Sequence, residues 1–110
     1  MTNPRTLIIM RGLPGSGKST FVKENFPDAV VCSADSFFVN EDGEYIFENW
    51  KLQQAHQHCF RTFIEAITSD AEIIVIDNTN TCRWEYENYV FMAEKFGYRI
   101  RIIRMNFAES

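Results

Sequence analysis

The stretch Gly12-Leu13-Pro14-Gly15-Ser16-Gly17-Lys18-Ser19-Thr20 decides how the rest of the sequence is interpreted. From Gly12 to Ser19 it matches the pattern G-x-x-x-x-G-K-[ST] without a mismatch. The glycines let backbone N–H groups curl around phosphate oxygens, in a geometry that a Cβ would obstruct. The motif predicts that this stretch binds a nucleoside triphosphate, which we expect to be ATP. Lys18 should reach the β- and γ-phosphates, and the Ser19 hydroxyl should ligate Mg²⁺.

The segments on either side of this loop alternate between strand and helix patterns. Short apolar runs typical of buried strands occur at residues 6–10, 29–32, 72–77 and 99–105. Helices are predicted from Lys18 to just before Pro27, over residues 50–69, and from a cap at Thr81 to a terminating Gly97. Alternation of this kind requires crossover connections. It predicts one domain over residues 1–110 with a three-layer αβα architecture and a parallel sheet.

Charge, cysteine spacing and the distribution of apolar residues restrict which partners this protein can have. The net charge of −4 repels a phosphate backbone overall, so any contact with nucleic acid should be local. Cys32, Cys59 and Cys82 are widely spaced and form no CxxC pair, which favours small buried hydrophobes over metal ligands or disulfides. The N-terminal residues carry no apolar signal region, and no run approaches membrane-spanning length. We therefore expect a cytoplasmic protein with no membrane partner.

Two carboxylates follow strands, where a phosphoryl-transfer site would need them. Asp77 ends the apolar run at residues 73–76 and is predicted to hold Mg²⁺ or its waters. The alternative is a turn residue, because Asp77-Asn78-Thr79-Asn80 is rich in turn formers. Asp35 follows the second strand, and the carboxyl ends of such strands face the ligand. It could accept a proton from an attacking hydroxyl, or it could simply cap a helix or form a turn.

Other conspicuous side chains have a packing interpretation. His56 lies beside the apolar stripe of its helix and is expected to be partly buried and satisfied. Trp50 and Trp84 are at core spacing, and packing is the favoured interpretation over base stacking.

Three segments together resemble the polynucleotide-kinase-like branch of phosphate-loop proteins: residues 11–20, 32–35 and 76–80. That branch includes polynucleotide 5′-hydroxyl kinases and the phosphate-loop domains joined to cyclic-nucleotide phosphodiesterases. The middle of the chain looks closest to the kinase domains of certain ubiquitin-ligase-binding proteins. The shared features there are Tyr45-x-Phe47, Ala55-His56, and Trp84-Glu85 ahead of Tyr89-Val90.

The resemblance implies a kinase fold with strand order 2-3-1-4. It implies Lys18 and Ser19 as phosphate and Mg²⁺ ligands and Asp35 as the general base for a 5′-hydroxyl of a nucleic acid or nucleotide. It also places Asp77 or Asn78 near the metal or the acceptor.

The sequence departs from the family pattern at two places. Phe38 stands where many polynucleotide kinases have an arginine, three residues after the base. The sequence also stops at Ser110, shortly after the fourth predicted strand, whereas the family continues into a helical lid that carries an arginine. These residues are therefore expected to lack the lid.

The sequence leaves three functions open. The first is an ATP-dependent kinase of a 5′-hydroxyl. The second is an ATP-binding module with little or no catalysis, and the third is a small-metabolite kinase on the same fold.

Overall fold

The computed structural model describes residues 5–12, 17–38, 40–78, 80 and 83–105. The strands are β1 (Thr6–Arg11), β2 (Val30–Cys32), β3 (Ile73–Asp77) and β4 (Arg99–Arg104). The α-helices are α1 (Lys18–Asn25), α2 (Leu52–Thr68) and α3 (Glu87–Lys95). Short 3-10 helices precede or separate them, namely η1 (Asp35–Phe38), η2 (Asn49–Lys51) and η3 (Arg83–Glu85).

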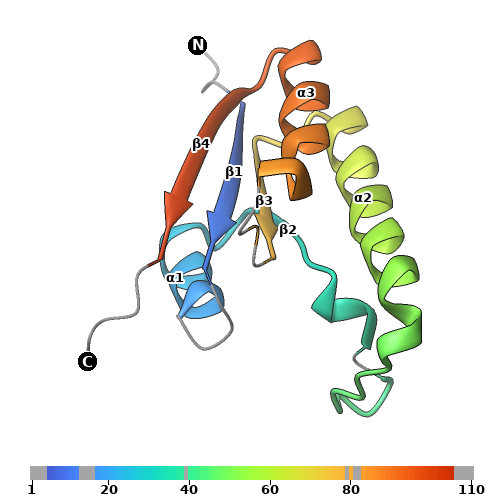
Figure 1. The fold of residues 1–110 in the computed structure, drawn as a ribbon. Helices are drawn as coiled ribbons and strands as arrows, with labels where there is room; N and C mark the ends of the chain where they lie inside the picture. Colours follow the sequence, from blue (N-terminus) through green and yellow to red (C-terminus); the bar gives the residue numbers. More distant parts are fainter. Residues whose placement is uncertain (1–4, 13–16, 39, 79, 81–82, 106–110) are drawn as a thin grey trace.

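Within the described residues, the strands form one four-stranded sheet in the order β2-β3-β1-β4. All three pairings are parallel, as the alternation of strands and helices predicts. The order is the one that the family resemblance implies. Met10 pairs with Asp77, and Arg11 pairs with Arg104, so the last residues of neighbouring strands end at one edge. This edge positions the candidate site (Figure 1).

Helices cover both faces of the sheet, which gives three layers (Figure 1). On one face, Val22 of α1 packs with Ile8 and Met10 of β1. On the other face, α2 and α3 pack against Leu7 and Ile9 of the same strand. These four β1 side chains are each at most 1% exposed, which explains why the strand is apolar at successive rather than alternate positions.

Cys32 and Cys59 lie in the core between the sheet and α2, with no exposed surface. Burial raises the pKa of the Cys32 thiol to about 12, so it is neutral at physiological pH. Burial raises the pKa of the Cys59 thiol as well. The expectation of small buried hydrophobes is confirmed for these two cysteines, whereas Cys82 lies outside the described residues.

The predicted helix boundaries need two corrections. Residues 49–51 form η2 rather than the first turn of α2. Residues 83–85 form η3, and Tyr86, with φ −123° and ψ 0°, separates them from α3. Trp50 and Trp84, on these short helices, are 72% and 73% exposed, so the packing expectation is wrong for both. Gly97 follows α3 with φ +81°, as its predicted place at the helix end requires.

Candidate functional site

The candidate site lies at the carboxyl edge of β1 and β3, where two distant motifs meet. The Ser19 hydroxyl of α1 donates a hydrogen bond to Asp77 Oδ2 at 3.2 Å. Asp77 is only 8% exposed because it ends a strand in the middle of the sheet. A hydroxyl and a buried carboxylate are hard oxygen ligands of the kind that Mg²⁺ prefers, so this pair fits that ion.

The two ends of the glycine-rich loop are held close to this pair. Gly17 caps α1 with φ +86° and ψ 14°, a left-handed conformation that favours glycine. The Lys18 ammonium donates a hydrogen bond to the Gly12 carbonyl oxygen at 2.8 Å and so bridges the loop. Thr20 follows on α1 as an exposed residue. The motif residues between these ends lie outside the described residues: Leu13, Pro14, Gly15 and Ser16.

The backbone of Asp35 lies just beyond the end of β2, where η1 begins. The structure does not describe its side chain. Its neighbour Ala34 is 6% exposed and donates its N–H to Asn78 Oδ1 at 2.9 Å. This bond ties the segment that leads into Asp35 to the residue after Asp77. The sequence-predicted residues Asp35, Asp77 and Asn78 therefore come from two adjacent strand ends.

Asn78 also connects the sheet to the two helices on one face. Its Nδ2 donates to the Cys59 sulfur of α2 at 3.5 Å. The hydroxyl of Tyr89, on α3, donates to the same sulfur at 3.3 Å. We name Asn78, Cys59 and Tyr89 the sulfur network. The network holds Nδ2 of the Asn78 amide, and the Ala34 N–H holds its Oδ1.

Asn80 is a structural residue of the site that the sequence identifies only as one of a run of turn formers. It is 1% exposed and has φ +48°, and its Nδ2 donates to the Met10 carbonyl oxygen at 2.7 Å. Arg11 Nε in turn donates to the Asn80 carbonyl oxygen at 2.8 Å. The Arg11 guanidinium lies 5.5 Å from the ring centroid of Tyr86. The signal was present, because asparagine tolerates the left-handed region better than other side chains.

His56 corrects another expectation. It is exposed on α2 rather than partly buried, because the adjacent Ala55 takes the core-facing position. His56 instead lines a pocket between α2 and α3.

In the part of the chain that the structure describes, none of the helices has the length and apolar character needed to cross a membrane.

Comparison with known proteins places the chain among phosphate-loop proteins. A family model described as an AAA domain matches residues 7–110. Human NEDD4-binding protein 2 is 37% identical over 97 residues, which cover 86% of this chain and 5% of the human protein. Mouse 2′,3′-cyclic-nucleotide 3′-phosphodiesterase is 28% identical over 103 residues, covering 90% of this chain and 23% of the mouse enzyme. The chain thus spans a small part of the length of these two relatives.

Solved structures share the fold at low sequence identity. A chain of the Pnkp1/Rnl/Hen1 complex superposes with a TM-score of 0.70 at 20% identity, covering 96% of this chain and 37% of that one. A chain of AvrRxo1-ORF1:-ORF2 with ATP superposes with a TM-score of 0.62 at 19% identity, covering 92% and 37%. Both comparisons agree with the sheet order and layers described for this chain.

Proposed function

This chain belongs to the AAA-domain family of phosphate-loop proteins with a kinase-like fold, and on that premise we propose that it is an ATP-dependent phosphotransferase. In this proposal it transfers the γ-phosphate of ATP to the 5′-hydroxyl of a nucleic acid or nucleotide. The observation that carries the proposal is the 3.2 Å contact between Ser19 and Asp77 beside Lys18. It brings the glycine-rich motif and the strand-end carboxylate to one point of the sheet edge.

The comparisons with known proteins support ATP as the phosphate donor and a nucleic acid or nucleotide as the acceptor. One structural neighbour, AvrRxo1-ORF1:-ORF2, was crystallised with ATP, and the mouse relative is named for its action on cyclic nucleotides. The resemblance of residues 11–20, 32–35 and 76–80 to polynucleotide kinases supports a 5′-hydroxyl acceptor.

In the proposed complex, different residues of this chain bind the phosphates of ATP and the Mg²⁺ ion. The glycine-rich loop at residues 12–20 would hold the phosphates through its backbone N–H groups and the positive end of α1. Lys18 would exchange the Gly12 carbonyl oxygen for β- and γ-phosphate oxygens, because a charged acceptor makes the stronger hydrogen bond. Ser19 and Asp77 would hold Mg²⁺, which when bound neutralises charge on the β- and γ-phosphates.

Asp35 is proposed as the general base of the transfer. Its carboxylate accepts the proton of the acceptor hydroxyl while that oxygen bonds to the γ-phosphorus. The bond from the γ-phosphorus to the β–γ bridging oxygen breaks, and ADP leaves with that oxygen. Asn78 positions this base, because its Oδ1 holds the Ala34 N–H immediately before Asp35. We also assign to Asn78 a contact with the acceptor.

The test is transfer of γ-labelled phosphate to DNA and RNA oligonucleotides that carry a 5′-hydroxyl, with 5′-phosphorylated oligonucleotides as the substrate control. Lys18→Ala should abolish both ATP binding and transfer. Asp35→Asn should keep ATP affinity and lower the transfer rate by about 100-fold or more. Asp42→Asn, which changes an exposed carboxylate in the turn after Asn40, is the matched control and should leave the rate unchanged.

Transfer that is indifferent to both Lys18→Ala and Asp35→Asn would refute the proposal. ATP binding that Lys18→Ala abolishes, without transfer to any oligonucleotide, would favour a nucleotide-binding module. ATP consumption with small hydroxyl compounds but not with oligonucleotides would favour a metabolite kinase.

A further inference from the structure

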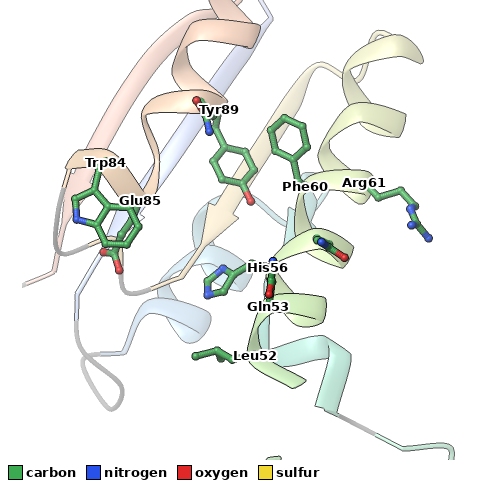
Figure 2. A pocket seen from close by; sticks show the side chains of 10 residues that line it. Leu52, Gln53, His56, Phe60, Arg61, Trp84, Glu85 and Tyr89 are labelled. Carbon is green, nitrogen blue, oxygen red and sulfur yellow. The ribbon is translucent and has the colours of Figure 1, made fainter. Parts of the chain in front are cut away.

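A pocket of about 940 Å³ opens between the first half of α2 and the segment formed by η3 and the start of α3 (Figure 2). Its volume is in the range of sites that bury a small organic ligand. The pocket lies on the face of the sheet that α2 and α3 cover, whereas α1 packs on the opposite face.

The walls of the pocket combine an aromatic surface with hydrogen-bonding groups. Figure 2 shows Trp84 on one side and His56 and Gln53 of α2 on the other. The Trp84 indole is 73% exposed, so its face is open to a ligand. Phe60 and Tyr89 line another part of the wall, with ring centroids 5.3 Å apart in an edge-to-face arrangement.

The pocket is connected to the candidate site by the sulfur network. Tyr89 lines the pocket, and its hydroxyl donates to the Cys59 sulfur at 3.3 Å. The same sulfur accepts the Asn78 amide at 3.5 Å, next to Asp77. Only two hydrogen bonds therefore separate the wall of the pocket from the end of β3. A ligand seated there would contact Tyr89 and so be linked through this network to Asn78, the residue to which the proposed function assigns a contact with the acceptor.

We propose that this pocket binds an unpaired nucleobase of the phosphate acceptor, stacked on Trp84. The inference rests on the proposed function and specifies its substrate as a single-stranded end. Every nucleobase offers a flat face to an indole, and the Gln53 and Asn88 amides both donate and accept hydrogen bonds, as base edges do. The net charge of −4 makes backbone attraction weak overall, so stacking has to supply a large part of acceptor affinity.

The position of the pocket favours a base of the acceptor over the adenine of ATP as its ligand. The phosphates of ATP are assigned to the loop that leads into α1, and α1 packs on the other face of the sheet from the pocket. The acceptor must approach the γ-phosphate from the side away from ADP. Asn78, to which the proposed function assigns a contact with the acceptor, is linked to the pocket wall through the sulfur network.

The two tryptophans of the sequence allow a binding test that is independent of catalysis. Trp50 is 72% exposed on η2 and is not among the residues that line the pocket, so it is a matched control for Trp84. Trp50→Phe leaves Trp84 as the sole tryptophan, and Trp84→Phe leaves Trp50. A single-stranded trinucleotide with a 5′-hydroxyl should quench the Trp84 emission of the first variant and leave the second unchanged. Equal quenching in both variants, or none in the first, would overturn the proposal.

Steady-state kinetics of transfer give the second test. Trp84→Ala should raise the KM for the trinucleotide by about tenfold and leave kcat and the KM for ATP within about twofold. Trp84→Phe should restore most of the loss because a phenyl ring still stacks, and Trp50→Ala should behave like the unmodified protein. ATP alone quenching Trp84 in competition with the trinucleotide would assign the pocket to adenine and overturn the inference.

The two proposals can fail separately. Quenching of Trp84 by the trinucleotide without any phosphate transfer would support the pocket and remove the proposed function. Transfer to the trinucleotide with an unchanged KM in Trp84→Ala would support the function and overturn the pocket.

Discussion

Among single residues, Asn80 links β1 and β3 near their carboxyl ends, because its amide lies within hydrogen-bond distance of Met10 in β1 and Ile76 in β3. Its buried amide donates to Met10 of β1, and its carbonyl oxygen accepts from Arg11. Asn80→Ala would leave the Met10 carbonyl oxygen without this donor and place an ordinary side chain at φ +48°. We expect a loss of about 2–4 kcal/mol in the free energy of unfolding, measured by urea denaturation.

Asn80→Gly separates the two causes. Glycine accepts the left-handed conformation but cannot donate to Met10, so its loss should be about 1 kcal/mol smaller than that of Asn80→Ala. Equal stability of Asn80→Ala and the unmodified protein would show that the amide has no structural role.

At the scale of elements, the packing of α2 against α3 depends on Phe63. Phe63 has no exposed surface, and its ring centroid lies 5.0 Å from that of Tyr89. Phe63→Ala should lower the free energy of unfolding by about 3–5 kcal/mol, because the cavity cannot close between two packed helices. Phe91→Ala on α3 is the control. Its ring is 58% exposed, and the expected change is below about 1 kcal/mol. Similar losses for both variants in denaturant titrations would contradict this account.

The elements also show how far sequence reasoning extends. The strand at residues 73–77 was predictable because a strand between two helical layers has to be apolar on both faces. Trp84 was misplaced because helical spacing assumes an unbroken helix. Tyr86 interrupts it with φ −123°, which turns Trp84 away from the buried stripe. Asn80 could be recognised as a turn residue, but its acceptor, Met10, is remote in sequence and local patterns carry no information about it.

At the scale of the whole molecule, ATP binding at the sheet edge should stabilise the entire domain. A ligand that binds the folded state alone adds about 2.7 kcal/mol when present at about 100 times its Kd. Thermal unfolding with and without Mg²⁺-ATP should show this stabilisation, and chelating the Mg²⁺ should reduce it because the ion that we propose between Ser19 and Asp77 is then removed. Lys18→Ala should abolish the effect, whereas Lys23→Ala, an exposed lysine later in α1, should retain it. Stabilisation that survives Lys18→Ala would place ATP elsewhere.

The central position of β1 has a consequence for how this chain folds as it is synthesised. β1 leaves the ribosome before the other three strands, and its partners follow much later, because Thr6 pairs with Ile73 on one side and with Arg99 on the other. Until β3 emerges, an apolar strand that ends up almost fully buried has no sheet to join, and long loops must close before it gains one. The nascent domain is therefore exposed to aggregation until β3 and β4 have emerged. Folding of the domain must wait until nearly its last strand has been made.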